Sequence, residues 1–119
     1  MTVNIQIFGT KKSSDTRKAE RWFKERRIKA QSIDLLDKGI SRGELRSVAS
    51  ACGGLDALID PGCRDADALA FVQCIAPAQR EEAVLERPQV LRQPIVRNGK
   101  RAAVGYQPQV YAAWMKEEN

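Results

Sequence analysis

The sequence predicts an α/β fold in which a βαβ unit and a ββα unit are separated by a helical insertion. Residues 3–36 show a strand pattern, a helix pattern and a second strand pattern in succession. Turn and helix-capping residues dominate the insertion, at about 40–88, and two further strand patterns occur in residues 94–105. A chain of 119 residues has the length of one domain, so we expect a single domain over 1–119.

The first strand is predicted over residues 3–8, where Val3-Asn4-Ile5-Gln6-Ile7-Phe8 alternates apolar and polar side chains. A short loop then leads into a helix that ends near Arg27. Ser13, Ser14 or Asp15 caps this helix, because each has a side-chain oxygen that accepts a hydrogen bond from a free backbone N–H.

Trp22 and Phe23 recur at helical spacing with Ala19, and we expect both aromatic side chains in the core. Residues 28–36 form the second predicted strand. Two strands that flank a helix of this length form a βαβ unit, which implies parallel strands and a right-handed crossover.

Three helices are predicted in the insertion. Ser41 and Glu44 form a capping box that opens the first helix, which ends at Gly53-Gly54. Asp60-Pro61-Gly62 indicates a turn. The other two helices are predicted over residues 66–75 and 78–86.

The C-terminal part is predicted as a hairpin followed by a helix. Strands over 94–97 and 101–105 are joined at Asn98-Gly99, a dipeptide typical of two-residue hairpin turns. The closing helix covers 107–116, with Val110 and Trp114 on its inner stripe and Tyr111 beside it.

The chain is basic, with 20 Lys and Arg against 15 Asp and Glu, and a formal net charge of +5. The densest basic stretch, residues 11–29, also contains Asp15, Glu20 and Glu25. This interleaving is typical of a solvated helix face supported by i,i+4 ion pairs. Because no exposed aromatic residues are interleaved with the cations, direct nucleic-acid binding is not favoured.

Three cysteines, Cys52, Cys63 and Cys74, occur at intervals of eleven residues. An odd number without a CxxC pair argues against a disulfide scaffold and against a zinc site, so no metal is expected. Alanine-rich surroundings predict that Cys52 and Cys74 pack in the interior. Cys63, beside Arg64, is interpreted as an incidental loop thiol.

No apolar run approaches the ~18–20 residues that cross a bilayer, and the N-terminal residues lack the features of a secretory signal. We therefore expect a cytoplasmic protein that does not bind membranes, and a monomer by default.

A βαβ unit joined to a ββα unit, with a proline entering the third strand, is the thioredoxin-like arrangement. Within it, FGTKKSSDTRKAERWFKERRI, residues 8–28, resembles the N-terminal active-site segment of the ArsC/Spx family of glutaredoxin-like arsenate reductases and their relatives. RPQVLRQPIVRNGKRAAVGY, residues 87–106, resembles the C-terminal signature of this family, and LDALID, residues 55–60, its mid-chain segment.

The resemblance places the nucleophilic cysteine of the family at Ser13 when Arg17-Lys18-Ala19 is aligned without a gap, with Ser14 as the neighbouring alternative. In two-cysteine members the resolving cysteine falls at Thr16. Pro94 falls at the proline that the family holds in the cis form.

Arsenate reductases of the family hold their oxyanion with three arginines. In this chain the position of the first arginine is occupied by Asp60, with Arg64 nearby, and that of the second by Gln93, with Arg92 one position earlier. The third falls near residues 106–107. None of the three is matched, so the resemblance does not extend to arsenate reduction.

A helix N-terminus stabilises a thiolate, and Lys11 and Lys12 add positive charge there. A serine hydroxyl gains too little from the same field, and the chain has no histidine to act as a base. A lysine would have to serve, but Lys11 and Lys12 stand in an exposed basic loop. We therefore interpret Ser13 or Ser14 as a helix cap.

Three explanations of the serine stay open. In the first, the serine replaces a cysteine or selenocysteine. In the second, the protein is a redox-dead member that binds a partner, as Spx-like proteins bind the RNA polymerase α C-terminal domain. In the third, the helix N-terminus keeps an anion site together with Arg64 and Arg92. The first explanation implies that the reductant is either glutathione with glutaredoxin, or thioredoxin. It also implies that the partner is a small thiol or a redox protein. No bound cofactor is expected, and the substrate is not identified.

Overall fold

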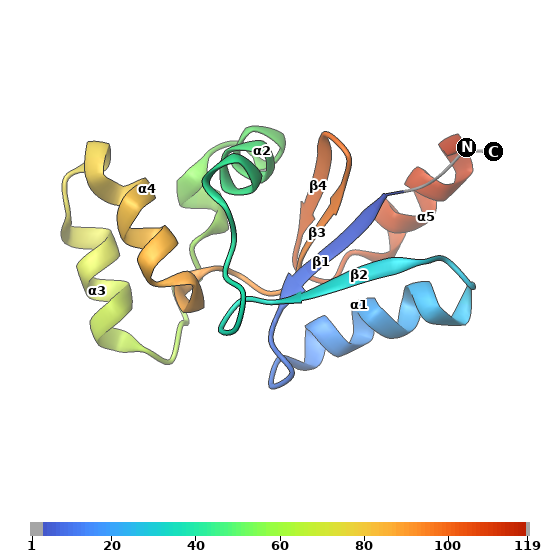
Figure 1. Ribbon diagram of the computed structural model, residues 1–119, viewed down its shortest axis with the longest axis horizontal. Coiled ribbons are helices and arrows are strands. Elements are labelled where there is room, and N and C mark those ends of the chain that lie inside the picture. The colour runs from blue at the N-terminus through green and yellow to red at the C-terminus, as the bar shows by residue number, and fades with distance from the viewer. Residues whose placement is uncertain (1–3, 119) are drawn as a thin grey trace.

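The computed structural model describes residues 4–118 as a four-stranded sheet with helices on both faces (Figure 1). Val3, the predicted start of the first strand, lies outside the described residues. In chain order the elements are β1 (Ile5–Gly9), α1 (Ser14–Glu25), β2 (Ala30–Asp34), α2 (Arg42–Cys52), the 3₁₀ helix η1 (Leu55–Leu58), α3 (Ala66–Cys74), α4 (Pro77–Glu86), the 3₁₀ helix η2 (Pro88–Val90), β3 (Ile95–Asn98), β4 (Arg101–Val104) and α5 (Pro108–Glu118).

The strand order in the sheet is β2-β1-β3-β4. β1 pairs in parallel with β2 and antiparallel with β3, so that Ile7 lies between Ser32 and Val96. β3 and β4 form an antiparallel hairpin whose two loop residues are Gly99 and Lys100, one position later than predicted. The predicted βαβ unit, helical insertion and ββα unit are thus all present.

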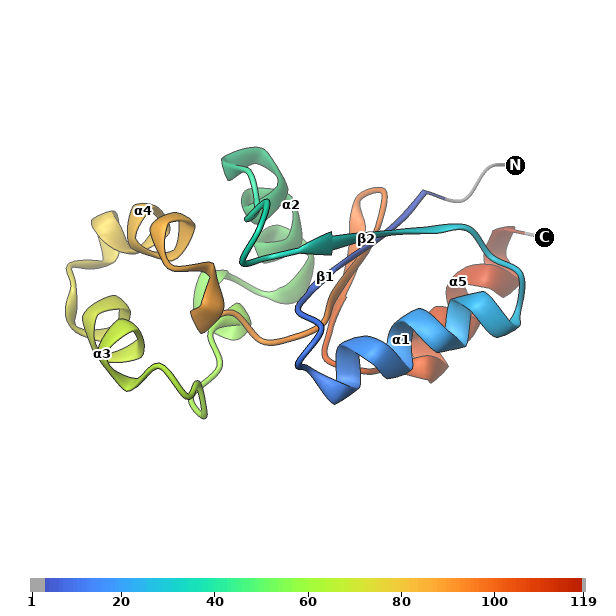
Figure 2. The same cartoon turned by 60° about the horizontal axis from the view of Figure 1, so that its bottom comes forward.

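Successive residues of β1 point to opposite faces of the sheet and enter two different cores. Ile7 packs with α1 and α5, whereas Phe8 packs with Leu45 and Val48 of α2 and with the rest of the insertion. Figure 2 shows α3 and α4 at the opposite end of the molecule from α5.

An aromatic cluster fills the core under α1 and α5. The predicted core positions of Trp22, Phe23 and Trp114 are confirmed. On α5, however, it is Tyr111 that is completely buried, whereas Val110 is half-buried. Burial raises the pKa of Tyr111 to about 12, and its hydroxyl donates a hydrogen bond to the carbonyl of Gly105 over 3.0 Å.

The insertion is fastened by caps and by one central arginine. The predicted capping box of Ser41 and Glu44 is present, and α2 ends at Gly53 in the left-handed conformation. Arg80 of α4 donates to the carbonyl of Val72 at the end of α3 and to the carboxylate of Asp56 in η1, each over 3.0 Å. It therefore joins three elements of the insertion.

Cys74 is exposed at the end of α3, so the prediction that it packs in the interior is wrong. Its alanine-rich helix turns this position to solvent and buries Ala68 and Val72 instead. Cys52 is half-buried, and burial raises the pKa of its thiol. None of the helices within residues 4–118 is long and apolar enough to cross a membrane.

Candidate functional site

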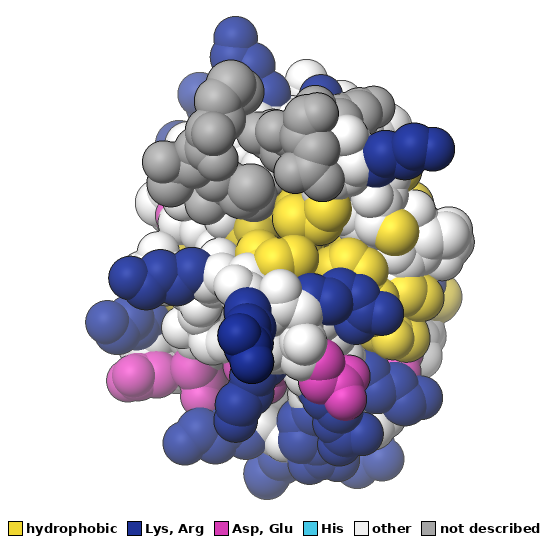
Figure 3. Space-filling view, turned by 90° about the vertical axis from the view of Figure 1, so that its right-hand side faces the viewer, with side chains coloured by type: hydrophobic (Ala, Val, Ile, Leu, Met, Phe, Trp, Pro, Cys, Tyr) yellow, Lys and Arg dark blue, Asp and Glu magenta, His cyan; other side chains and the backbone are white. Residues whose placement is uncertain are grey.

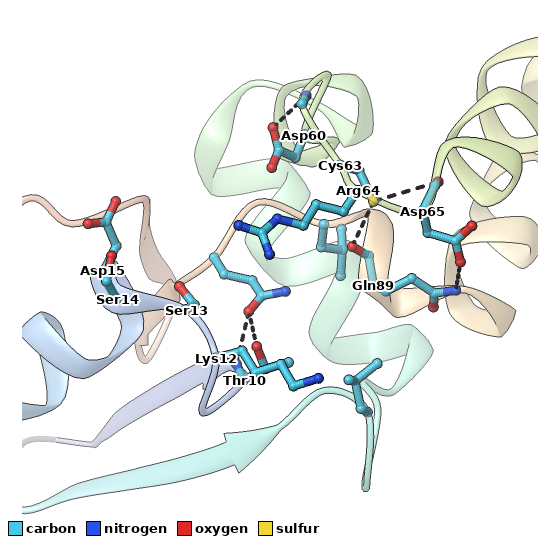
Figure 4. A pocket seen from close by; sticks show the side chains of 14 residues that line it. Thr10, Lys12, Ser13, Ser14, Asp15, Asp60, Cys63, Arg64, Asp65 and Gln89 are labelled. Atoms are coloured by element: carbon cyan, nitrogen blue, oxygen red, sulfur yellow. Dashed lines mark hydrogen bonds between the residues drawn. The ribbon is translucent and has the colours of Figure 1, made fainter.

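A cavity of about 740 Å³ lies where three segments distant in sequence meet: the loop before α1, the loop before α3 and the stretch before β3 (Figure 4). The loop before α1 contributes Thr10, Lys12 and Ser13, and Leu36 also lines the cavity. Five site residues that were predicted from the sequence line this cavity: Lys12, Ser13, Ser14, Arg64 and Gln93.

Ser13 is the N-cap of α1. Its backbone is extended, with φ −82° and ψ 117°, and its side-chain oxygen accepts a hydrogen bond from the Thr16 N–H over 3.2 Å. Ser14 is the exposed first residue of the helix. Of the three caps that the sequence allowed, the structure thus selects the position where the resemblance puts the nucleophile.

Thr16, at the position of a resolving cysteine, is buried against β1 and does not line the cavity. Its side chain packs on Gly9 so closely that a Cβ at Gly9 would lie 2.3 Å from the Thr16 Oγ1. This Oγ1 has no hydrogen-bond partner in the part of the chain whose side chains are described, residues 4–116. Position 16 is therefore a packing position in this chain.

Gln93 binds the loop before α1 to the segment before β3. Its Oε1 accepts hydrogen bonds from the backbone N–H and the hydroxyl of Thr10, over 2.9 and 2.8 Å. The Gln93-Pro94 peptide bond is cis, as the resemblance implied for Pro94. Sequence reasoning missed Thr10, because nothing in the sequence signals a contact that joins residues 83 positions apart.

The cavity carries charges of both signs. Lys12 and Arg64 line it together with the carboxylates of Asp15, Asp60 and Asp65. The hydrogen bond from the Gln89 side chain, followed by that from the Ala68 backbone, holds the pKa of Asp65 below its ordinary value. The site as a whole is therefore mixed in charge and differs from a purely cationic oxyanion pocket.

Arg64 is the cation that the loop before α3 contributes to the cavity. Figure 4 shows its side chain extending from the loop before α3 toward the α1 side. Within the described part of the chain, its guanidinium has no hydrogen-bond or ion-pair partner. It is therefore available to an anionic group.

The structure does not bring Lys11 and Arg92 to the same cavity. Lys11 is exposed outside it, and its carbonyl accepts a hydrogen bond from Arg17 over 2.9 Å. Arg92 lies in a separate hollow of about 420 Å³ with Asp56 and Arg80. Gln93 lines the cavity at Ser13, whereas its neighbour Arg92 lines only the other hollow.

Cys63 is half-buried and lines the cavity. Its Sγ donates to the carbonyl of Gln89 over 3.3 Å and approaches the carbonyl of Asp65 at 3.9 Å. The sequence pointed to an incidental loop thiol, whereas the structure places this thiol in the same cavity as Ser13. Among the side chains of residues 4–116 there is no cluster of three or more His, Cys, Asp or Glu suited to a metal ion.

The sequence model described as ArsC family matches residues 8–114. Global transcriptional regulator Spx 2 of Oceanobacillus iheyensis is 33% identical over 108 residues, which cover 89% of this chain and 78% of that protein. Global transcriptional regulator Spx 2 of Lactococcus lactis subsp. lactis is 26% identical over 113 residues, which cover 93% of this chain and 86% of that protein.

Among solved structures, the arsenate reductase from Vibrio cholerae superposes with a TM-score of 0.79 at 20% identity, covering 95% of this chain and 98% of that one. An ArsC family related protein from Bacteroides fragilis gives a TM-score of 0.78 at 13% identity, with the same two coverages. These similarities show the fold, and they confirm the predicted thioredoxin-like arrangement.

Proposed function

The chain belongs to the ArsC family, and from that premise we propose that it is a redox-silent member, which keeps the scaffold of a thiol or selenol oxidoreductase without the reactive atom. The observation that carries this proposal is the Ser13 hydroxyl. It stands at the nucleophile position, and its oxygen caps α1 by accepting from the Thr16 N–H.

A thiol at this position would be activated by its surroundings, but a hydroxyl is not. The amides at the start of α1 and nearby cations lower the pKa of a thiol from its ordinary value of about 8.5 into a reactive range. A serine needs an adjacent base that removes its proton. The chain has no histidine, and Lys12 is exposed to solvent.

Arsenate is not the substrate that the cavity favours. Asp60 and Gln93 stand where the family resemblance places oxyanion-binding arginines. A carboxylate repels an oxyanion, and the Gln93 Oε1 is engaged with Thr10. Among the described residues that line this cavity, Arg64 and Lys12 alone remain to attract an anion.

A regulatory role is the second candidate, and the names of the relatives favour it. The two Spx 2 proteins are named global transcriptional regulators, and each matches about nine-tenths of this chain. A protein of this kind works through a partner and needs no reactive group at position 13. On the resemblance to Spx-like proteins, the first partner to test is the RNA polymerase α C-terminal domain.

The redox-silent proposal is tested by restoring a thiol at Ser13 in a Cys63→Ser background, so that the two cavity thiols are not confused. We expect the Ser13→Cys thiol to titrate below about 8.5 and to form a mixed disulfide with glutathione disulfide. Ser14→Cys is the matched control and should react more slowly, because residue 14 does not cap the helix. An ordinary pKa in Ser13→Cys would contradict an activating scaffold.

The codons at positions 13 and 14 of the gene give an independent test. Serine codons at both positions support a protein that is naturally redox-silent. A TGA, TGC or TGT codon at either position would mean that the cellular protein carries selenocysteine or cysteine there, and the proposal would be wrong.

A further inference from the structure

We propose that the outer face of α1 binds an acidic segment of a partner protein. This surface is the basic ridge, which we define as Arg17, Arg21, Lys24 and Arg27. All four side chains are exposed, and none lines the cavity at Ser13. The inference therefore goes beyond the proposed function, and either can fail without the other.

The ridge follows from the helical period. Arg17, Arg21 and Lys24 are spaced i, i+4 and i+7, which places them on one stripe over about 10 Å of helix. The opposite stripe buries Ala19 and Phe23 in the core. Figure 3 shows one end of the molecule, where Lys and Arg side chains crowd the lower half and Asp and Glu are few.

Among the side chains of residues 4–116, the acidic residues of the same segment form no ion pair with the cations of this ridge. Glu20 is well placed for an i,i+4 pair with Lys24, but it accepts a hydrogen bond from Ser32 of β2 over 2.5 Å. Asp15 pairs with Lys18, at 3.7 Å. Across the described side chains, residues 4–116, Arg21 and Lys24 have no ion pair, so these two cations lack the expected support by i,i+4 pairs, and the pair of Asp15 and Lys18 is an i,i+3 pair.

Arg27 extends the row of cations at a position that does not suit arginine. It follows the helix C-cap with φ 58°, a left-handed conformation that favours glycine or asparagine. A residue that adopts an unfavourable backbone conformation is expected to have a compensating role. A positive charge at the end of the ridge supplies such a role, and it also complements the helix dipole there.

The chemistry of the ridge favours protein over nucleic acid. The two aromatic residues of α1, Trp22 and Phe23, are buried, and the guanidinium of Arg26 lies 4.0 Å from the Trp22 ring centroid, so α1 has no ring available for stacking on bases. A row of cations one helical turn apart instead matches an acidic helix whose carboxylates have the same spacing.

The probe is a synthetic helical peptide with glutamates at i, i+4 and i+7, and its glutamine counterpart is the peptide control. Binding is measured by fluorescence anisotropy at low and at high salt with the full-length protein. The ridge variant is Arg21→Glu/Lys24→Glu. Lys38→Glu/Lys100→Glu, in exposed turns elsewhere, is the control with the same net charge. Circular dichroism checks the fold, and Arg21→Ala/Lys24→Ala replaces the reversal if it fails to fold.

We expect the ridge variant to weaken binding of the glutamate peptide about tenfold at low salt, and the control variant to weaken it less than about twofold. High salt should abolish the difference. Equal weakening in both variants, or no binding by the natural protein, would overturn the proposal. Tighter binding of a short DNA duplex than of the peptide, lost in the ridge variant, would also overturn it and assign the surface to nucleic acid.

Discussion

Replacing Ser13 by alanine removes the hydrogen bond that its side-chain oxygen accepts from the Thr16 N–H. The substitution leaves that N–H without a partner at the half-buried start of α1. Ser14→Ala is the matched control, because Ser14 is the exposed first residue of the helix and is not the cap. The pair of variants separates a capping role at position 13 from any general effect of losing a hydroxyl in this loop.

Losing a serine N-cap costs about 1 kcal/mol of the free energy of unfolding, within a range of about 0.5–2 kcal/mol. The bond here is long, at 3.2 Å, so we expect a value near the middle or lower part of that range. For a chain of this size, about 1 kcal/mol corresponds to a decrease in Tm of about 4 °C. Ser14→Ala should change the free energy by less than about 0.5 kcal/mol.

The assay is urea unfolding at neutral pH followed by circular dichroism, with thermal unfolding as a check. Ser13→Asp completes the series, since a carboxylate also caps a helix and is favoured by the helix dipole. It should retain or exceed the natural stability. If Ser13→Ala is no less stable than Ser14→Ala, the side chain of Ser13 is not a functioning cap, and the structural explanation of the serine is wrong.

Three further outcomes follow from packing and titration. Gly9→Ala should lower the free energy of unfolding by about 1–3 kcal/mol, because the new Cβ would lie 2.3 Å from the Thr16 Oγ1. Adding Thr16→Ala should restore part of the lost stability, and no recovery would contradict this contact. Burial raises the pKa of Tyr111 to about 12, so the contribution of Tyr111 to stability is constant below pH ~10 and is lost as the pH rises toward 12, because the unfolded chain ionises first. Tyr111→Phe should reduce the alkaline decrease in the free energy of unfolding by up to about 2–3 kcal/mol. An unchanged slope would exclude Tyr111 as its cause. Iodoacetamide should modify Cys74 fastest and Cys52 slowest, as followed by mass spectrometry, because Cys74 is exposed whereas burial raises the pKa of Cys52. Labelling of Cys52 before Cys74 would contradict the placement of α3.

Local patterns were sufficient for most of the secondary structure. Caps and turns such as Ser41 with Glu44 and the break at Gly53 have direct sequence signals, and each is where it was predicted. The 3₁₀ helices η1 and η2 were missed, because single turns have no hydrophobic period. The second strand was predicted too long, since Ile28 and Lys29 precede the five residues that pair with β1.

The site was harder to predict, because it depends on which side chains converge. The resemblance implied a cis bond at Pro94, which the structure contains, yet it could not show that Gln93 turns its amide oxygen to Thr10. Nor could it show that Cys63 lies in the same cavity as Ser13. These contacts depend on rotamers and on long-range packing, for which a single sequence has no local signal.

The most direct test of the central claim is glutathione-dependent turnover by the natural protein, measured with glutaredoxin present and with a disulfide or arsenate as the oxidant. Ser13→Ala and Cys63→Ser are assayed in parallel. The account predicts no turnover by the natural protein above the rate without it. Turnover that disappears in Ser13→Ala or in Cys63→Ser would contradict a redox-silent site, and it would identify which of the two cavity residues performs the chemistry.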